Sequence, residues 1–269
     1  MIAKELALRD TLSSLGSVIV AYSGGVDSAY LACVAHETLG ARARAVTAQS
    51  PSYPARHRRL AEQIARQFGL RHEFIRTSEM DRPEYRANPI DRCYYCKHEL
   101  YTHLSRLAAG REAVVIDGNN ADDRGDHRPG RRAAREFGVR SPLDEVDLGK
   151  IEIRELSRRR GLPTWDEPAS ACLSSRIPYH SDVTNEKLRM IEDAEEVLRS
   201  LGFRICRVRH HDELARIEIG KDELPRAMQQ ETSEAIVSGL KALGYRHVTI
   251  DPQGYRTGSL NEGLVLRPA

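Results

Sequence analysis

The 269-residue chain has little lysine, little net charge and no long apolar run. Six of its 41 basic residues are lysine and the other 35 are arginine, and a net charge of +2 offers no broad surface for nucleic acid. No apolar stretch approaches the ~20 residues of a membrane-spanning helix. The first residues also lack the charged and then apolar profile of a secretory signal. We therefore expect a cytoplasmic protein that binds neither nucleic acid nor a membrane.

Cysteine is sparse as well. Five cysteines without a secretory signal argue against a disulfide framework and favour metal or redox chemistry. We assign Cys33 and Cys206 to the core, where cysteine is commonly buried. The chain also lacks a Walker Gly-Lys-Ser/Thr loop and a Gly-x-Gly-x-x-Gly dinucleotide motif. A nucleotide would therefore have to be held by a different kind of loop.

Residues 23–28, Ser-Gly-Gly-Val-Asp-Ser, form a candidate loop of that different kind. They stand between a β-branched apolar run at 17–22 and a helical pattern at 29–39. A glycine-rich turn at such a junction points backbone N–H groups outward, and the helix start adds partial positive charge. The segment resembles the PP-loop of enzymes that split ATP between its α- and β-phosphates. The alternative is a turn that merely caps a helix.

Each residue type in this loop suits the binding of ATP and pyrophosphate. The glycines allow close approach of the backbone, the serines supply hydroxyl donors, and the aspartate can hold Mg²⁺ directly or through water. The predicted ligands of ATP, pyrophosphate and Mg²⁺ are Ser23, Gly24, Gly25, Asp27 and Ser28.

Strand and helix patterns alternate through the first two thirds of the chain. The predicted strands are 17–22, 43–47, 72–75 and 113–116, and the predicted helices are 29–39, 54–68, 96–108 and 151–160. This alternation predicts an α/β fold, a Rossmann-like parallel sheet with helices on both faces and ligands beyond the carboxyl ends of its strands.

The pattern changes near residue 178. A helix at 184–201, a hairpin of 203–209 and 214–219, a helix at 231–243 and a strand at 247–250 predict a smaller α+β domain. We therefore predict a PP-loop domain over residues 1–178, and a domain for substrate binding or oligomerisation over residues 179–269.

Three cysteines remain as candidate ligands. Cys93 and Cys96 form a Cys-x-x-Cys at the start of a predicted helix, a motif that suits a redox dithiol, half a zinc site or part of an iron–sulfur site. Two incidental thiols are the alternative. Cys172 lies in a loop of small residues beside the predicted interdomain link. Three thiolates suit a [4Fe–4S] cluster with one iron lacking a protein ligand, or an open zinc site.

These features together resemble the LarE-type ATP-dependent sulfur transferases over nearly the whole chain. The segments that carry the resemblance are 23–28, 88–97, 117–123, 126–130, 141–143 and 169–179. The resemblance implies that a carboxylate of pyridinium-3,5-biscarboxylic acid mononucleotide is adenylated, with release of pyrophosphate, and becomes a thiocarboxylate. That reaction serves the synthesis of the nickel-pincer cofactor of lactate racemase. It further implies a small-molecule nucleotide substrate and a homo-oligomer, commonly a hexamer.

The resemblance also bears on the source of the sulfur. Some members of this family sacrifice the sulfur of the cysteine that matches Cys172, whereas others carry three cysteines and are thought to bind a [4Fe–4S] cluster. This chain has the second pattern, which implies that Cys93, Cys96 and Cys172 are catalytic and ligate the cluster. One local departure is Glu167, where lysine is the expected residue.

Further roles follow by matching position. Arg207 and Arg209 resemble arginines that bind the substrate phosphate, and two residues apart on a strand they share a face, which suits a single clamp. A solvated basic edge strand is the alternative. Glu196 and Glu218 resemble acidic residues near the substrate and a bound metal ion, here Mg²⁺. For Glu196 a plain solvated carboxylate is the alternative.

Another group of candidates follows the strand at 113–116. Asp122, Asp126 and Arg128 stand at its predicted carboxyl end, where catalytic groups collect. We expect Asp126 and Arg128 at the active centre, an Asp-rich turn being the alternative. Arg92 and Lys97 are further candidates for phosphate or adenylate binding.

Three other functions remain open on the sequence. A cluster-dependent tRNA thiolase would need a basic RNA-binding surface. An amidating ligase such as NAD or GMP synthetase would need ammonia, and no glutaminase domain is visible. A non-catalytic nucleotide-binding protein would have no need for the three cysteines.

Overall fold

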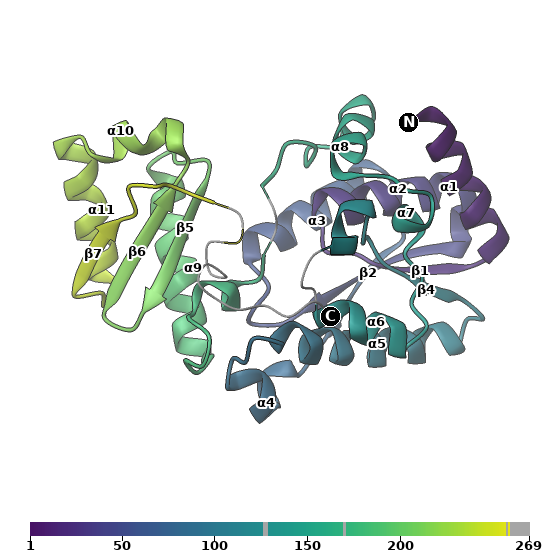
Figure 1. The fold of residues 1–269 in the computed structure, drawn as a ribbon, viewed down its shortest axis with the longest axis horizontal. Helices are drawn as coiled ribbons and strands as arrows, with labels where there is room; N and C mark the ends of the chain where they lie inside the picture. Colours follow the sequence, from purple (N-terminus) through teal and green to yellow (C-terminus); the bar gives the residue numbers. More distant parts are fainter. Residues whose placement is uncertain (126–128, 169–170, 257, 259–269) are drawn as a thin grey trace. The chain divides into compact units, whose positions relative to one another are not determined.

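The chain divides into two units in the computed structural model, which describes residues 1–125, 129–168, 171–256 and 258 (Figure 1). Of the described residues, unit 1 holds those in 1–79 and 91–168, and unit 2 holds 80–90, 171–256 and 258. The predicted boundary after residue 178 stays a prediction.

Unit 1 contains a four-stranded sheet in the order β3-β2-β1-β4. Every neighbouring pair of its strands is parallel, as the sequence predicts. Its strands are β1 (Val18–Ala21), β2 (Ala43–Gln49), β3 (His72–Arg76) and β4 (Val114–Ile116). Its helices are α1 (Ile2–Leu15), α2 (Val26–Leu39), α3 (Ala55–Gln67), α5 (Arg92–Ala109), α6 (Pro129–Glu136), α7 (Pro142–Glu145) and α8 (Lys150–Arg159).

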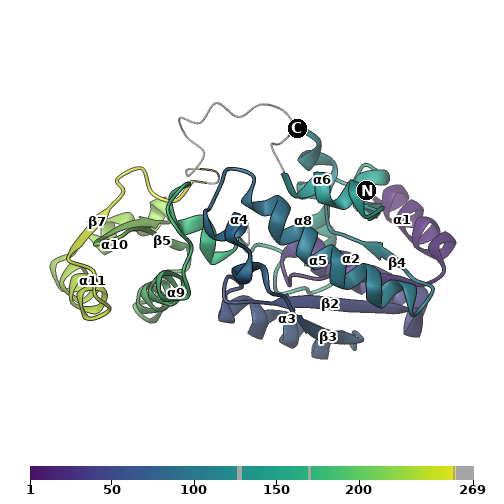
Figure 2. The ribbon, with the colours of Figure 1, turned by 90° about the horizontal axis from the view of Figure 1, so that it is seen from below.

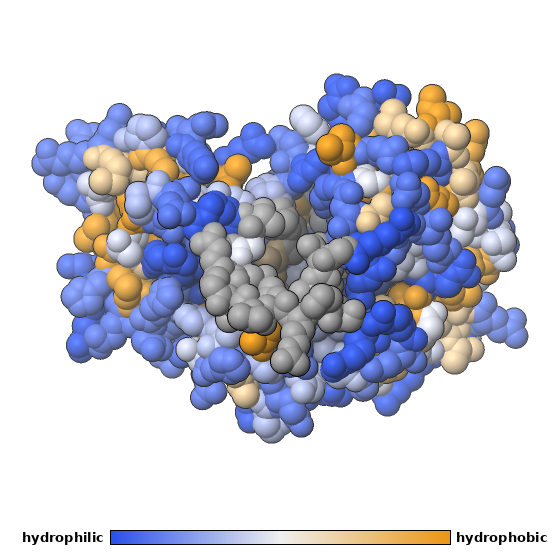
Figure 3. Space-filling model, viewed as in Figure 1, coloured by the Kyte–Doolittle hydropathy of each residue, from blue (hydrophilic) through white to orange (hydrophobic). Residues whose placement is uncertain are grey.

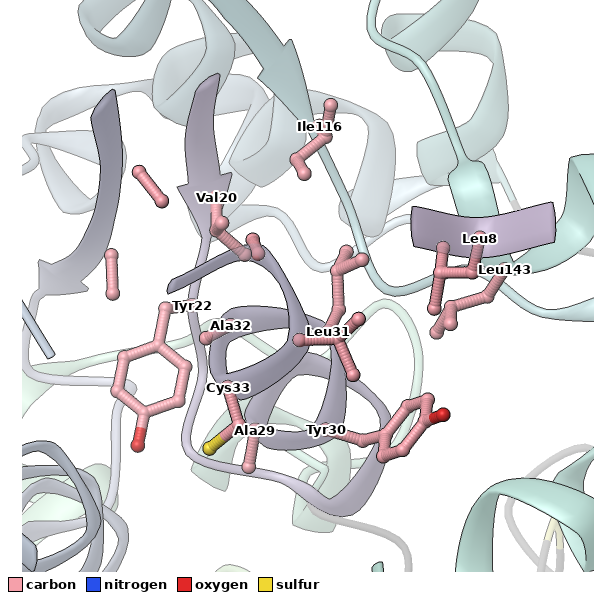
Figure 4. Packing of buried hydrophobic residues seen from close by; sticks show 14 of the residues in the cluster. Leu8, Val20, Tyr22, Ala29, Tyr30, Leu31, Ala32, Cys33, Ile116 and Leu143 are labelled. Atoms are coloured by element: carbon pink, nitrogen blue, oxygen red, sulfur yellow. The ribbon is translucent and has the colours of Figure 1, made fainter. Parts of the chain in front are cut away.

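Alternate residues of the central strand β1 face opposite layers of helices. Val18 and Val20 belong to a core with α1, α2, α3 and α8, and Figure 4 shows Val20 beside the apolar side of α2. Ile19 and Ala21 belong to a second core with α5 and α6. Figure 1 shows α2 and α8 above the sheet and α5 and α6 below it, and the view from below in Figure 2 brings α5 forward. The predicted α/β fold is therefore confirmed.

Unit 2 contains a three-stranded sheet in the order β5-β6-β7, formed by β5 (Cys206–His211), β6 (Leu214–Ile219) and β7 (His247–Ile250). β5 and β6 form the predicted antiparallel hairpin, and β7 pairs with β6 in parallel. One face of this sheet packs in an apolar core against residues of three helices. The helices of the unit are α4 (Pro83–Arg86), α9 (Asn185–Ser200), α10 (Leu224–Ala227) and α11 (Gln230–Ala242).

Unit 2 also includes residues 80–90, which the sequence patterns did not assign to it. Asn88 explains the association: it is fully buried, has a φ of 52°, and its amide donates to the carbonyls of Ile177 (3.3 Å) and Pro178 (2.7 Å). The hydroxyl groups of Tyr85 and Ser174 lie 2.7 Å apart. Residues 80–90 thus hold the segment that follows Cys172.

Several helix boundaries differ from the sequence prediction. α2 begins earlier, at Val26, with Gly25 as its N-cap, and α5 begins at Arg92, so that the Cys-x-x-Cys lies within the helix. The patterns did not predict α1, which buries Leu8 and Leu12. Among the described residues no helix is long and apolar enough to cross a membrane, and the face in Figure 3 is mostly hydrophilic.

Candidate active site

The PP-loop, residues 23–28, leaves the carboxyl end of β1 and enters α2. Its two serines are joined, because the Ser28 hydroxyl accepts from the backbone N–H of Ser23 at 3.1 Å and lies 3.0 Å from the Ser23 hydroxyl. Tyr53 donates to the Ser23 carbonyl at 3.0 Å. The loop is therefore pinned from both sides while Ser23 itself remains exposed, as a phosphate ligand requires.

Gly24 is the residue that the loop geometry requires to be glycine. Its φ of 70° lies in the left-handed region, and an added Cβ would lie 2.8 Å from the Cβ of Ala61 on α3. A second close approach involves Gly118, after β4, where a Cβ would lie 3.0 Å from the backbone nitrogen of Ser28. The loop thus fits against two neighbouring segments of backbone.

Asp27, in the first turn of α2, pairs with Lys150 at the start of α8 through one carboxylate oxygen. Its other oxygen, Oδ1, is buried and has no hydrogen-bond partner among the described residues. The backbone N–H of Lys150 donates to Asp122 at 2.6 Å, which fixes the start of α8 to the loop after β4. Lys150 is a site residue that the sequence reasoning missed.

The loop after β4 is built around a buried carboxylate. Asp117 accepts from the hydroxyl groups of Tyr101 and Ser141, each at 2.8 Å, and from the amide of Asn119 at 2.6 Å. These contacts hold the loop at the carboxyl ends of β1 and β4, beside the PP-loop. Asp126 and Arg128, predicted at the active centre, lie outside the described residues.

Two thiols lie one turn apart at the start of α5. Cys93 is exposed and Cys96 partly exposed, as accessible ligands must be. The two cysteines assigned to the core are instead buried, and burial raises the pKa of the Cys33 thiol to about 12 and of the Cys206 thiol to about 11. Among the further candidates on α5, Arg92 is buried and the Lys97 ammonium lies over the Tyr101 ring.

Charged side chains line the face of the unit 2 sheet opposite its apolar core. Arg207 and Arg209 on β5 lie opposite Glu218 and Arg216 on β6. Arg209 binds Glu218 through two nitrogens, at 3.0 and 2.7 Å, and Arg216 bridges Glu218 and Asp251. Both β5 arginines are buried, 7% and 6% exposed, so they do not form a solvated edge.

A second buried cluster lies at the edge of β5. Glu195 of α9 is 1% exposed and binds Arg176 and Arg199, each at 2.8 Å. Burial by itself would raise the pKa of Glu195, but the charges of Arg176, Arg207 and Arg199 lower it to about 2. Unit 2 therefore gathers five arginines around four carboxylates, Glu195, Glu196, Glu218 and Asp251, and the one positive charge in excess favours an anion.

The resemblance predicts a site role for Glu196, whereas Glu195 and Arg176 were not predicted as site residues. Glu196 is exposed and pairs with Arg199 at 3.6 Å, so its metal role stays a prediction. The helical phase of α9 would have distinguished the two glutamates, because Glu195 shares the buried side of Ile191 and Leu198. Glu167, the local departure, forms a two-point ion pair with Arg56 in unit 1 at 3.1 and 2.6 Å.

Comparison with known proteins identifies the family. Residues 5–123 match the asparagine synthase family model. The chain is 34% identical over 263 residues to the pyridinium-3,5-bisthiocarboxylic acid mononucleotide synthase of Lactiplantibacillus plantarum, covering 97% of this chain and 95% of the relative. The chain belongs to this synthase family. The resemblance to the LarE-type enzymes is thereby confirmed, and the protein is an ATP-utilising PP-loop enzyme.

The chain is also similar to two further proteins. An uncharacterized protein of Synechocystis is 45% identical over 258 residues, 96% of both chains. One of the subunits of the glutamine-hydrolysing GMP synthase of Methanopyrus kandleri is 26% identical over 219 residues, 72% of this chain and 67% of the relative. The chain is thus similar to enzymes with different named products.

The residues of unit 1 fit the ATP and Mg²⁺ that the family implies. The buried Oδ1 of Asp27 offers an oxygen to a cation, and Gly24 leaves a cradle that a Cβ would fill. The three cysteines predicted to ligate an iron–sulfur cluster do not show such a fit. Among the described residues no cluster of three or more His, Cys, Asp or Glu side chains could hold a metal ion. Cys93 and Cys96 belong to unit 1 and Cys172 to unit 2, so their common site stays a prediction.

Proposed function

We propose that the protein is a sulfurtransferase that uses ATP to adenylate a carboxylate of pyridinium-3,5-biscarboxylic acid mononucleotide and converts it to a thiocarboxylate for the nickel-pincer cofactor. The observation that supports this most is the combination of a PP-loop in unit 1 with two neighbouring buried arginines, Arg207 and Arg209, on one face of the unit 2 sheet. A substrate that carries a carboxylate and a phosphate needs the PP-loop to activate its carboxylate with ATP and the arginines to bind its phosphate. The similarity to the Lactiplantibacillus plantarum synthase supports the same substrate.

In unit 1 the proposed chemistry is the cleavage of ATP between its α- and β-phosphates. Backbone N–H groups and the serine hydroxyls of the PP-loop hold the pyrophosphate, and the helix start of α2 stabilises its charge. Asp27 would hold Mg²⁺, which neutralises charge on the phosphates. The substrate carboxylate attacks the α-phosphorus, pyrophosphate leaves, and an acyl-adenylate forms.

In unit 2, Arg207 and Arg209 would hold the phosphate of the substrate. Both belong to one strand and are positioned by buried partners, so their guanidinium groups lose little freedom when an anion binds. Glu218 holds the Arg209 side chain through an ion pair, and the charge of Glu195 acts on Arg207, so both side chains stay at the sheet.

For the sulfur we propose that Cys93, Cys96 and Cys172 ligate a [4Fe–4S] cluster. Exposed or partly exposed thiols at the start of a helix suit such ligands. When bound, the cluster would supply a sulfide to the activated carboxylate. We further propose a cytoplasmic homo-oligomer that binds no nucleic acid.

The test is pyrophosphate release from ATP with the biscarboxylic acid mononucleotide as acceptor, followed by mass spectrometry of the product. We expect pyrophosphate and a product in which sulfur replaces one carboxylate oxygen. Asp27→Ala should abolish release while the protein stays folded, because Asp27 is outside the apolar cores. Asp10→Ala, an exposed aspartate on α1, is the control. Release that depends on ammonia and yields an amide would instead identify an amidating ligase.

A further inference from the structure

Arg176 is a buried arginine, 1% exposed, for which the proposed chemistry has no use. It ends η4 (Leu173–Arg176), the short helix that follows Cys172. Its Nη1 donates to the carbonyls of Ala171 and Cys172, each at 2.8 Å, while its Nε and Nη2 donate to Glu195 at 2.8 and 3.3 Å. The guanidinium therefore fills the inside of the turn that carries Cys172, residues 171–176, and ties this turn to α9.

The backbone of Cys172 is held at one point by several donors. Its carbonyl accepts from the backbone N–H of Ser175 at 3.0 Å, from the Ser175 hydroxyl at 2.7 Å and from Arg176. The Cys172 residue itself is nevertheless partly exposed. A fixed backbone below an accessible thiol is what precise positioning of a reacting sulfur requires.

The same turn is joined directly to the arginines of β5. Arg209 donates from Nη1 to the Ser175 carbonyl at 2.8 Å while its other nitrogens bind Glu218. Glu195, the partner of Arg176, accepts from the backbone N–H of Val208, between the two β5 arginines. The turn and Arg209 thus belong to one hydrogen-bonded network within unit 2, and Arg207, the other residue of the phosphate clamp, acts on this network through its charge near Glu195.

Folding stability alone does not account for the buried ion pairs of this network. Buried ion pairs often contribute little to stability relative to apolar side chains of the same volume, because both charges must leave water. Burial and the nearby charge of Arg176 both lower the pKa of Arg207, so this arginine is held in an environment that disfavours its charge. The negative charge of a bound phosphate would offset the repulsion between Arg207 and Arg176. The interactions of Arg176 and Arg209, which hold the Cys172 turn, would then change as well.

We propose that Arg176 is a positioning residue for sulfur transfer, which couples occupancy of the Arg207–Arg209 clamp to the placement of Cys172. This inference rests on the proposed function for the identity of the clamp's ligand. Arg176 acts through the backbone of residues 171 and 172, and it touches neither substrate nor ATP in this role.

The experiment measures how fast iodoacetamide alkylates Cys172 in the full-length protein without a cluster, followed by peptide mass spectrometry, with added glutathione as the reference thiol because Cys93 belongs to the same proposed ligand set. The probe is nicotinic acid mononucleotide, a pyridinium ribotide with one carboxylate and one phosphate. Inorganic phosphate alone is the second arm, which separates clamp occupancy from shielding by the pyridinium ring. With wild-type protein we expect the mononucleotide and inorganic phosphate each to change the rate of Cys172 alkylation by about fivefold or more. This is the usual size of coupling between two sites.

Arg176→Lys keeps a positive charge but has one nitrogen in place of the guanidinium that now reaches both the turn and Glu195. We expect the probe's effect on Cys172 to disappear while calorimetry still detects probe binding. The matched control is Arg199→Lys, since Arg199 binds the same carboxylate and donates to no carbonyl of the turn among the described residues. If Arg176→Lys fails to fold, Glu195→Gln, which removes the charge that holds Arg176, should abolish the coupling in the same way.

Three results would overturn the coupling. One is an unchanged rate in wild-type protein at saturating probe, another is an effect that persists in both variants, and the third is equal loss in the Arg199 control. None of these measurements needs ATP or sulfur transfer. A failure to form thiocarboxylate would therefore count against the proposed function and leave the coupling to be judged by alkylation.

Discussion

Lys150 at the start of α8 binds the carboxylate of Asp27 at the start of α2, across 123 residues of sequence. The contact uses Asp27 Oδ2 and leaves Oδ1 buried without a partner among the described residues. Lys150 therefore orients the aspartate that we assign to Mg²⁺ and places a positive charge beside the PP-loop. When a nucleotide binds, this ammonium is available to its phosphates.

The first prediction is that Lys150→Met impairs pyrophosphate release from ATP. A hydrogen bond to a charged group is worth about 1.5–3 kcal/mol, so we expect a loss of about tenfold to a hundredfold in kcat/KM for ATP. Lys150→Arg should lose less, because it keeps the charge. Lys187→Met, which removes the partner of Asp212 in unit 2, is the control. Unchanged kinetics for Lys150→Met would show that the pair has no role at the nucleotide.

The second prediction separates two reasons for glycine at position 24. Gly24 and Gly16 share nearly the same φ, 70° and 72°, but only Gly24 has a neighbour where a Cβ would stand, the Ala61 side chain at 2.8 Å. Each alanine substitution should cost about 1–2 kcal/mol of unfolding free energy for the left-handed backbone. Gly24→Ala should cost more and also weaken ATP binding.

Urea titrations of the two glycine variants measure this difference. Adding Ala61→Gly to Gly24→Ala should recover the steric part of the loss and leave the backbone part. Equal destabilisation by Gly24→Ala and Gly16→Ala would mean that α3 yields to the added methyl group.

The PP-loop could be predicted from the sequence because its determinants are local. The apolar run of β1, the glycine pair and the helical spacing of α2 are adjacent in the chain, and the same holds for the Cys-x-x-Cys on α5. Lys150 could not be found in this way, since its partner is distant in sequence. Nor could residues 80–90 be assigned to unit 2, because the buried amide of Asn88 reaches carbonyls about 90 residues away.

The third prediction concerns Arg207 and Arg209. Replacing either with methionine should weaken binding of the phosphorylated substrate about tenfold to a hundredfold, the worth of one charge-assisted hydrogen bond. ATP binding should change much less, because the PP-loop is in unit 1. Calorimetry with the mononucleotide and with its dephosphorylated nucleoside measures the difference. Equal losses for the two ligands would contradict a phosphate clamp.

The fourth prediction is a pH dependence of stability from His210. Burial first, and then the charge of Lys187, lowers its pKa to about 4, and its ring accepts or donates a hydrogen bond with Tyr245 at 3.0 Å. In the unfolded chain a histidine has a pKa of about 6.5. Between these values the unfolded state binds a proton that the folded state does not, so unfolding becomes easier as pH falls from 6.5 to 4.

Urea midpoints at pH 7 and pH 5 measure that dependence. His210→Gln should lower stability at pH 7 and flatten the dependence, whereas His247→Gln, at an exposed position of the same unit, should leave the slope unchanged. A His210→Gln slope equal to that of the wild type would assign the acid sensitivity to other groups.

The last prediction concerns how sulfur is supplied. A sacrificed Cys172 yields one sulfur per chain, whereas a cluster that receives external sulfide allows repeated turnover. If Cys93, Cys96 and Cys172 ligate a [4Fe–4S] cluster, protein purified without air should contain iron and acid-labile sulfide, and Cys93→Ser/Cys96→Ser should lose both. Cys33→Ser should keep the iron and the sulfide, because Cys33 is buried in the core of unit 1.

Product stoichiometry distinguishes the two sulfur sources. Given ATP, substrate and sulfide, the wild type should form more than one thiocarboxylate per chain and keep Cys172 intact by mass. Loss of one hydrogen sulfide from Cys172, with synthesis stopping after one sulfur, would show that the chemistry is sacrificial despite the two extra cysteines.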